Sequence, residues 1–477
     1  MSIRSLWGII SLLTVSSLAF AGSQEYLIRF HHNDPSSLNQ FIQRNGGTLE
    51  EVSREGQLYQ WNSAQTYNFS WDANVDYVQH NQPIHLFLNP SIESQKSALL
   101  KALADQPGMP DLGGQDFKDN PDIQDPPSVT DGVDPLLAKQ WGISMIGADS
   151  AYQKTKQGKD IVVAVTDTGV DYNHEDLISA IWHNKGEIAG NGIDDDKNGF
   201  VDDVIGWDFA SNDNKPYDLS VSLLDIVLKG GNPGHGTHVS GVIGGRLNNS
   251  LGGAGVAPQV RIMPIRFINE SGKGDDAAAV KAIDYAINNG ANIINASWGG
   301  EKGTEDDKAL KEALQRAQDK GVIFVAAAGN GRLDQAAMKE SGFDNDSDSK
   351  PVVPASYSFK NIVAVAAIDA QGKLGAFSNW GHKSVKVGAP GVKIMSTVPG
   401  NRYQDTVIDM GPLKATWDGT SMAAPFVSGA LAVIWSQDTT QTADQVIAKL
   451  TSMAAPIDGL KGKVVTEGRV DLKQLAQ

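Results

Sequence analysis

The chain has 477 residues; at about 150 residues per domain, its length predicts three domains, or two folded units with removable segments. Hydrophobic residues make up 40% and charged residues 20%, which supports a large core and excludes disorder throughout. The net charge of −16 argues against nucleic-acid binding, which needs a basic face. Acidic loops would instead favour the binding of cations. The absence of cysteine excludes a disulfide scaffold, a thiol nucleophile, a zinc–thiolate site and a lipid-modified cysteine anchor.

Residues 1–21 have the layout of a cleavable secretory signal. Arg4 gives a positive start, residues 6–18 form a mostly apolar run, and Ala19 and Ala21 are the small residues that a signal peptidase reads. The alternative is an uncleaved membrane anchor, but this run is short for a span of about 20 residues. We therefore expect an exported protein, extracellular or periplasmic, with no stable membrane anchor.

Residues 22–104 predict a small α+β unit. Asp34 can cap a helix that runs from Pro35 to Arg44. Strands are expected at 25–31, 48–52, 58–61, 75–79 and 84–88. A second helix, which a ferredoxin-like arrangement would need, is only weakly indicated. The following stretch, 105–134, is acidic and rich in proline and glycine, which is typical of an extended linker open to proteases.

Residues 135–477 alternate apolar strand-like runs with helical stretches. Strands are expected at 161–166, 260–267, 293–296, 322–328, 362–366 and 385–387, and helices include 276–288 and 306–320. This alternation predicts an α/β fold with a mostly parallel sheet covered by helices on both faces. In such folds ligands bind at the carboxyl ends of the strands.

Four polar residues stand at strand ends or at the helix starts that follow them. Asp167 ends a strand, Asn330 follows another, and His235 and Ser421 each stand at the start of an apolar helix. A strand-end carboxylate can orient an imidazole, and a serine at a helix N-terminus lies beside free backbone N–H groups that can stabilise an oxyanion. Taken singly, each has a structural explanation: a loop histidine, a turn or helix cap, or a turn residue beside glycine.

Taken together, the motifs resemble those of the subtilisin-like serine proteases (subtilases), in the order Asp, His, Ser. The resemblance extends from about residue 135 to the end of the chain. Its three active-site segments are Val163-Ala-Val-Thr-Asp-Thr-Gly-Val-Asp171, Gly234-His-Gly-Thr-His-Val-Ser-Gly241 and Gly419-Thr-Ser-Met-Ala-Ala-Pro425. Further matches are Asn295-Ala-Ser-Trp-Gly-Gly300 and Ala326-Ala-Ala-Gly-Asn330.

The resemblance implies a subtilisin-like fold and a role for each residue. Ser421 would be the nucleophile, His235 the general base, Asp167 its orienting carboxylate, and Asn330 a donor to the oxyanion. Ser297, Trp298 and Gly299 would pair with an extended substrate. Ala326, Ala327, Ala328 and Gly329 would form one wall of an apolar side-chain pocket. Residues 22–104 would be a propeptide that assists folding and inhibits the enzyme, and the linker would be cut during maturation.

Two stretches suggest calcium. The first begins like an EF-hand loop, although Ile205 stands where the twelfth-position Glu is expected; its predicted ligands are Asp194, Asp196, Asn198, Phe200 and Asp202. Subtilases carry similar insertions before their histidine; the alternative is a solvated acidic loop. The second resembles the main calcium loop of the family, with predicted ligands Asp176, Leu247, Asn249, Leu251 and Gly253.

One segment departs from the family pattern. Residues 211–232, just before the histidine motif, are longer and more apolar than expected, and 219–228 look helical. The leading hypothesis is a secreted, monomeric, calcium-stabilised serine endopeptidase that acts on proteins or peptides and is inhibited by its own propeptide. The rivals are a catalytically silent subtilase fold used for binding, an acyl-transfer enzyme on another α/β scaffold, and a calcium-binding adhesion module. The intact motifs disfavour the first, and the lack of a Gly-x-Ser-x-Gly elbow disfavours the second.

Overall fold

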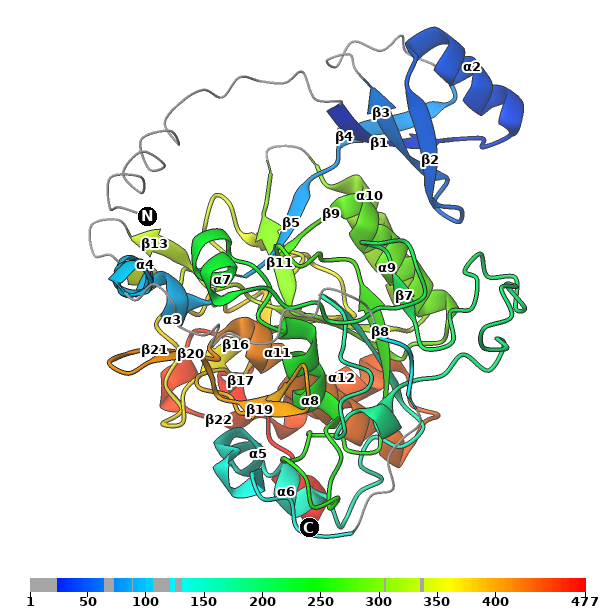
Figure 1. The fold of residues 1–477 in the computed structure, drawn as a ribbon. Coiled ribbons are helices and arrows are strands. Elements are labelled where there is room, and N and C mark those ends of the chain that lie inside the picture. Colours follow the sequence, from blue (N-terminus) through cyan, green and yellow to red (C-terminus); the bar gives the residue numbers. More distant parts are fainter. Residues whose placement is uncertain are drawn as a thin grey trace. The chain divides into compact units, whose positions relative to one another are not determined.

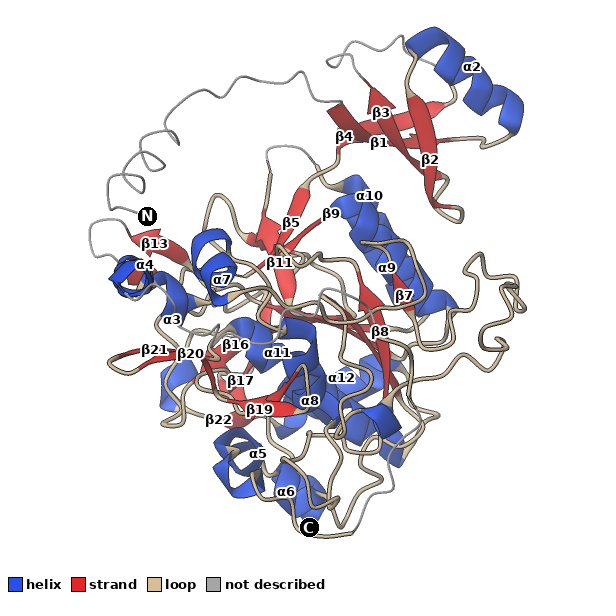
Figure 2. Cartoon of the chain, viewed as in Figure 1, coloured by secondary structure: helices blue, strands red, loops and turns tan. Residues whose placement is uncertain are grey.

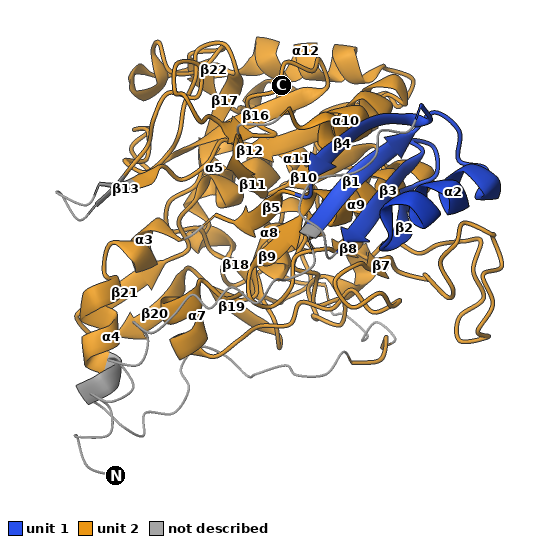
Figure 3. Cartoon of the chain, turned by 90° about the horizontal axis from the view of Figure 1, so that it is seen from above, with its two compact units in different colours: residues 1–81 blue, residues 82–477 orange. Residues whose placement is uncertain are grey.

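The computed structural model describes residues 24–63, 73–87, 89–105, 121–124, 131–303, 306–334 and 339–477. The chain divides into two compact units, residues 1–81 and 82–477 (Figure 3). The predicted signal peptide and most of the predicted linker lie outside the described residues. Within the part that is described, no helix combines the length and the apolar character needed to cross a bilayer.

The first unit is a four-stranded antiparallel sheet with one helix among its described residues. Asp34 caps the helix by accepting from the N–H groups of Ser36 and Ser37, as expected from the sequence. Phe41 of the helix packs with Phe30 and Trp61 of the sheet, which forms the small core. The strand order is β2-β3-β1-β4, with elements β1 (Gln24–Phe30), α2 (Pro35–Asn45), β2 (Thr48–Ser53), β3 (Leu58–Ser63) and β4 (Val75–His80).

The second unit is built on a nine-stranded sheet, mostly parallel, in the order β22-β23-β17-β16-β12-β10-β6-β8-β7 (Figures 1 and 2). Its strands are β6 (Val162–Asp167), β7 (Trp207–Asp208), β8 (Arg261–Arg266), β10 (Ile293–Ala296), β12 (Ile323–Ala327), β16 (Ile362–Ile368), β17 (Val385–Pro390), β22 (Ala455–Pro456) and β23 (Gly468–Arg469). Every residue of β10, β12 and β16 is buried, as expected of strands covered on both faces.

Helices cover this sheet. Helix α8 (His235–Gly244) packs against the long α11 (Thr420–Gln437), and α9 (Asp276–Asn288) packs against α10 (Lys308–Asp319) (Figure 1). The other helices are α3 (Pro90–Glu93), α4 (Lys96–Asp105), α5 (Trp141–Ile146), α6 (Ala148–Ala151), α7 (Leu223–Lys229) and α12 (Ala443–Met453). The predicted α/β fold is therefore confirmed, and most predicted strands and helices agree within a few residues.

Shorter strands surround the carboxyl edge of the large sheet. A second sheet has the order β15-β11-β5-β9, with β15 (Val352–Val353), β11 (Trp298–Glu301), β5 (Pro83–Leu86) and β9 (Lys273–Asp275). Three two-stranded ribbons are β13 (Arg332–Asp334) with β14 (Lys339–Ser341), β18 (Ser396–Val398) with β19 (Arg402–Gln404), and β20 (Thr406–Met410) with β21 (Leu413–Thr416).

One predicted strand has a different place from the one expected. The strand at 84–88 was expected to belong with the N-terminal α+β unit. It is instead β5, which pairs with β11 and β9 of the second unit. Residues 82–104 of the predicted 22–104 domain thus belong to the larger unit. An apolar run predicts a strand, but its partner depends on backbone pairing that periodicity does not encode.

A buried ion pair ties the edge strand β7 to β8. Arg266 donates to Asp208 at 2.5 Å, to Ser211 at 2.8 Å and to Glu270 at 3.0 Å. The side chains of Arg266 and Asp208 are 2% and 0% exposed, so neither charge is solvated by bulk water.

Replacing Arg266 alone should therefore be costly. We expect Arg266→Met to lower the free energy of unfolding by about 3–5 kcal/mol, because it leaves the Asp208 carboxylate buried without its cation. The double variant Arg266→Met/Asp208→Leu should recover much of this loss, since no charge then remains buried. Urea denaturation measures both; a single variant with the wild-type midpoint would contradict the assigned role of the pair.

Candidate active site

The predicted acid–base pair is assembled at the carboxyl edge of the large sheet. Asp167 is the last residue of β6 and His235 the first residue of α8. His235 Nδ1 lies 2.8 Å from Asp167 Oδ1, and both side chains are buried. The N–H and hydroxyl of Thr168 also lie at Asp167 Oδ1, at 2.7 and 3.2 Å. These contacts fix the carboxylate and leave Nε2 as the imidazole nitrogen that can exchange a proton.

Ser421 lies in the same pocket but is turned toward β11. It is the second residue of α11, and its Oγ donates to the Ser297 carbonyl at 2.9 Å. Among the described residues, His235 Nε2 has no hydrogen-bond partner. Both side chains line one pocket together with Asn330, Trp417 and Met422. To donate its proton to the imidazole, the Ser421 hydroxyl must turn away from the Ser297 carbonyl.

Asn330 is held with its amide oxygen turned away from the pocket. Its Oδ1 accepts from the N–H and the hydroxyl of Thr420, both at 2.9 Å. This orientation places Nδ2 on the side of Gly419 and Ser421: a Cβ built on Gly419 would lie 3.2 Å from it. The amide N–H groups in the first turn of a helix lack an intrahelical acceptor, so the Ser421 N–H is a second donor in this region.

A second carboxylate, which the sequence did not single out, supports the histidine loop. Asp218 is fully buried and accepts from Thr168, Asn232, and both the N–H and hydroxyl of Thr237, at 2.6–2.8 Å. Asn232 in turn accepts from the N–H of His235 at 2.8 Å. Burial raises the pKa of Asp218 to about 6, against the lowering effect of these donors. Because Asp218 stands 17 residues before His235, no local motif points to it.

The histidine of the next turn is a structural residue. His238 stacks on Trp417, with ring centroids 4.1 Å apart and planes 17° from parallel. Its Nε2 lies 2.9 Å from the Ile394 carbonyl, so this nitrogen carries the proton of a neutral ring. Burial lowers the pKa of His238 to about 3. The ring supports Trp417, which lines the pocket.

The chain itself occupies the groove beside Ser421. Strand β5 pairs antiparallel with β11, with Leu86 opposite Trp298 and His85 opposite Gly299, and with β9 on its other side. The Leu86 N–H donates to the Gly272 carbonyl at 3.0 Å. Trp298 and Gly299 of the predicted substrate segment thus pair with an extended strand that comes from residues 83–86 of the same chain.

The register places Phe87 beside the residue that contacts Ser421. One step beyond the Leu86–Trp298 pair, Phe87 falls opposite Ser297, whose carbonyl accepts from Ser421. A Cβ built on Gly299 would lie 2.8 Å from Phe87 Cζ and 3.2 Å from Val352 Cγ1, so the ring lies over a glycine, next to Val352. Glycine at 299 is required for this close approach.

The predicted apolar wall is only partly at the surface of this site. Ala326, Ala327 and Ala328 have no exposed surface, because they belong to or directly follow the buried strand β12. A Cβ built on Gly329 would lie 2.7 Å from Val352 Cγ2. The other methyl group of Val352 lies beside Gly299, as the Phe87 ring does. Val352, which sequence reasoning missed, therefore connects Gly329 to the Phe87 ring.

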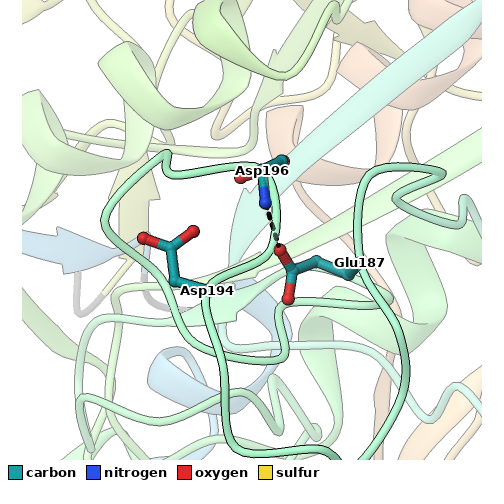
Figure 4. A group of neighbouring side chains, drawn as sticks. All are labelled: Glu187, Asp194 and Asp196. Carbon is teal, nitrogen blue, oxygen red and sulfur yellow. Dashed lines mark hydrogen bonds between the residues drawn. The ribbon is translucent and has the colours of Figure 1, made fainter.

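The acidic loop brings three carboxylates together. Oxygens of Glu187, Asp194 and Asp196 all lie within 4.8 Å of one another (Figure 4). Glu187 also accepts from the N–H groups of Asp195, Asp196 and Asp202, which folds the loop around it. Carboxylate oxygens are the type of donor that a hard divalent cation such as calcium prefers, although calcium takes about six to eight oxygens and the remainder would come from other groups. Glu187 lies outside the alternating motif, so the sequence pattern did not point to it.

The other three predicted ligands of this loop make different contacts. The Asp202 carboxylate accepts from the N–H groups of Asn191 and Gly192 at 3.1 and 2.8 Å. Asn198 Oδ1 accepts from the Phe200 N–H at 2.8 Å, and the Phe200 ring packs on Trp207 and Tyr285. The acidic side chains of the cluster are thus Glu187, Asp194 and Asp196, and the ligand roles of Asn198, Phe200 and Asp202 stay a prediction.

At the second predicted cation site, the side chains contact each other directly. Asn249 Nδ2 donates to Asp176 Oδ1 at 2.8 Å, while Asn249 Oδ1 accepts from the Leu251 N–H. Burial raises the pKa of Asp176 to about 8, and the nearby Asp134 adds to this shift. Asp134 accepts from the N–H groups of Asn248 and Asn249, closing the loop that contains Leu247 and Gly253. The ligand roles of these residues stay a prediction.

Comparison with known proteins agrees with this geometry. Residues 158–473 match the Subtilase family, so the chain belongs to that family. It is 33% identical to thermitase of Thermoactinomyces vulgaris over 345 residues, which cover 72% of this chain and 98% of thermitase. It is 35% identical to a thermophilic serine proteinase of Bacillus sp. (strain AK1), over 62% of this chain and 58% of that protein.

A relative of greater length contains a similar region. The chain is 33% identical to subtilisin-like protease 2 of Plasmodium falciparum (isolate 3D7), over 69% of this chain. The matched region spans only 22% of that relative's length, so the two proteins differ in their remaining parts.

The buried His238 predicts a specific acid sensitivity. The folded pKa lies below the ordinary value of 6.5, so the unfolded chain binds the proton more readily. Stability from this group is therefore fully present above pH 6.5 and is lost as the pH falls toward 3.

We expect His238→Gln, which cannot take up this proton, to lose less stability than wild type between pH 7 and pH 4. Urea denaturation across this range measures it, with the exposed His382→Gln as control; parallel curves would contradict the role of His238.

Proposed function

We propose that the protein is a serine endopeptidase, exported through the signal predicted at 1–21 and made as an autoinhibited precursor. The observation that carries the proposal is the Asp167–His235 pair beside Ser421, with the chain's own strand paired along the groove. Membership of the Subtilase family and similarity to thermitase support the same activity.

The proposed reaction begins when Ser421 turns toward His235. The Oγ attacks the carbonyl carbon of the scissile peptide while its proton passes to His235 Nε2, giving a tetrahedral intermediate. Asp167 keeps Nδ1 protonated and stabilises the imidazolium. His235 then gives the proton to the departing amine as the C–N bond breaks, which leaves an acyl ester on Ser421. Water, deprotonated by His235, hydrolyses this ester and restores the serine.

Two donors would stabilise the negative oxygen of the intermediate. Asn330 Nδ2 and the Ser421 N–H are the groups in position, and Thr420 holds the Asn330 amide through its oxygen. Because these donors are fixed before the reaction, they need no reorganisation when charge develops, and losing one costs on the order of 10²–10³ in rate. Asp218 and Asn232 act as positioning residues that hold the His235 backbone.

The paired segment supports a substrate preference. Ile84 and Leu86 are buried while His85 is exposed, the alternation expected when an extended peptide lies in a groove. Phe87 lines the same pocket as Ser421, and its ring lies over Gly299. We infer that the enzyme prefers a large apolar residue on the acyl side of the bond, and that Phe87–Leu88 is the first bond cut in its own precursor.

The pairing of β5 also supports autoinhibition. While residues 83–87 lie in the groove, a protein substrate cannot pair with β11. The proposed propeptide therefore inhibits by occupying the site as a substrate would. Apart from its own propeptide, the proposed partners are protein and peptide substrates, and we expect the protein to act as a monomer.

Self-cleavage can be tested on the exported full chain. Mass spectrometry of wild type should find an N-terminus at Leu88 or further along, whereas Ser421→Ala should retain Phe87, because the variant lacks the nucleophile. Ser436→Ala, which changes a buried serine in the same helix, should be processed like wild type.

Two results would contradict self-processing. If wild type and Ser421→Ala are trimmed alike, a separate protease matures the chain. If both retain residues 22–87 and wild type hydrolyses no peptide, the catalytically silent subtilase fold becomes the better hypothesis.

We further propose that calcium stabilises the folded enzyme through Glu187, Asp194 and Asp196. Their oxygens fit the preference of this cation, and a ligand that binds only the folded state stabilises it by about 2.7 kcal/mol at 100 times its dissociation constant. The loop lies away from the residues that line the Ser421 pocket, so the proposed role is structural.

Treatment with a chelator can distinguish this cluster from the set of calcium ligands predicted by sequence. EDTA should lower the melting temperature of wild type, and Glu187→Gln should reduce that loss, since one ligand is gone. Asp202→Asn should keep the response to EDTA, because its carboxylate caps Asn191 and Gly192. Calorimetry with and without 1 mM calcium measures this. A wild-type melting temperature that is unchanged by EDTA would remove the calcium proposal.

A further inference from the structure

The insertion before the histidine motif is fixed at both ends beside His235. Asn232 donates to Asp218 at 2.6 Å and to the Leu219 carbonyl at 2.9 Å, closing residues 219–231 into a loop. The Val221 N–H donates to the Asn232 carbonyl at 3.0 Å. Because Asn232 also holds the His235 N–H, the loop emerges directly from the catalytic histidine.

Helix α7 forms the centre of this insertion and has two distinct faces. Leu223, Ile226 and Val227 are buried, whereas Leu224 and Leu228 are 49% and 48% exposed. Ile226, Gly230 and Gly231 line the same pocket as His235 and Ser421. The buried face of α7 is therefore part of the wall of the active site, although none of its residues is needed for the proposed bond cleavage.

The chain that follows Phe87 covers this face. Ile92 of α3 is 4% exposed and lines the pocket together with Ile226. Helix α4 packs against α7, and its Leu99 is fully buried. Residues beyond the bond that we propose to be cut thus bury apolar side chains against the insertion.

Strand β21 holds the same segment by polar contacts. Asn89 donates to the Thr416 carbonyl at 2.9 Å, and the Thr416 N–H donates to Ser91 Oγ at 3.2 Å. Gln95 donates to the Lys414 carbonyl at 2.6 Å. Backbone groups of β21 therefore hold polar side chains of residues 89–95, while Ile92 supplies an apolar contact.

We propose that α7 and β21 form a binding site for the leaving-group side of protein substrates, selecting an apolar residue five positions after the residue whose carbonyl is attacked. The inference rests on the proposed function, and residues 89–105 occupy the site as a substrate would. Fully burying an isoleucine contributes about 1.5–3 kcal/mol, which corresponds to about ten- to a hundredfold in affinity. Substrates that end shortly after the cleaved bond forgo this contribution.

The first test uses peptides and the wild-type enzyme after both the Phe87–Leu88 bond and the linker have been cut. One peptide carries residues 83–105; a second is the same peptide with Ile92→Ser. An acyl-Ile-His-Leu-Phe p-nitroanilide, which has no residues beyond the bond, reports the proposed chemistry alone. We expect kcat/KM to be about tenfold higher or more for the first peptide than for the second. Equal values would overturn the inference but leave the proposed function standing, provided that the p-nitroanilide is hydrolysed; no hydrolysis of any of the three would overturn both.

The second test uses the enzyme. For each variant, kcat/KM for the 83–105 peptide is divided by that for the p-nitroanilide, so that differences in active fraction cancel. Ile226→Ala should lower this ratio about tenfold. Leu228→Ala, on the exposed side of α7, should leave the ratio at the wild-type value. An unchanged ratio for Ile226→Ala, or an equal fall for both variants, would contradict the binding site.

Discussion

The buried hydrogen-bond network between Asp167 and Asp218 is the constraint on which the site depends. The hydroxyl of Thr168 lies 2.8 Å from Asp218 and 3.2 Å from Asp167, and it accepts from the N–H of Gly236. One carboxylate holds the imidazole of His235, and the other accepts from the Asn232 side chain before it and the Thr237 N–H after it. Because these groups are buried, each unsatisfied donor or acceptor would cost about 1–3 kcal/mol, which makes the arrangement unique rather than one of several.

Close backbone approach reinforces the same arrangement. A Cβ built on Gly236 would lie 2.0 Å from the Gly169 carbonyl oxygen, so the loop after Asp167 and the helix that begins at His235 are in direct contact. No side chain fits between them. The spacing of Asp167 and His235 is thus set by backbone geometry and by buried donors, and the large parallel sheet supplies the rigid edge on which both are mounted.

Sequence reasoning singles out candidate residues where chemistry and local pattern coincide. Asp167, Asn330 and Ser421 stand at strand ends and a helix start, positions that apolar periodicity predicts directly. It did not find Asp218, because the insertion separates it from His235, or Glu187, because it precedes the alternating acidic motif. It also could not find the partner of β5: the run at 84–88 predicts a strand, but only the fold shows that it lies between β9 and β11.

A single stretch of chain runs through both the acyl side and the leaving-group side of the groove. After cleavage, release of its two parts from the groove would depend differently on dilution. Cutting Phe87–Leu88 would make residues 22–87 a separate molecule, whose hold on the groove weakens on dilution. Residues 88–105 would stay joined through 106–134 to the catalytic unit, where Asp134 is anchored by Asn248 and Asn249. A tethered segment has a local concentration in the millimolar range, whatever the volume around it. Dilution can thus clear the acyl side of the groove, whereas the leaving-group side opens only when a second bond in the tether is broken.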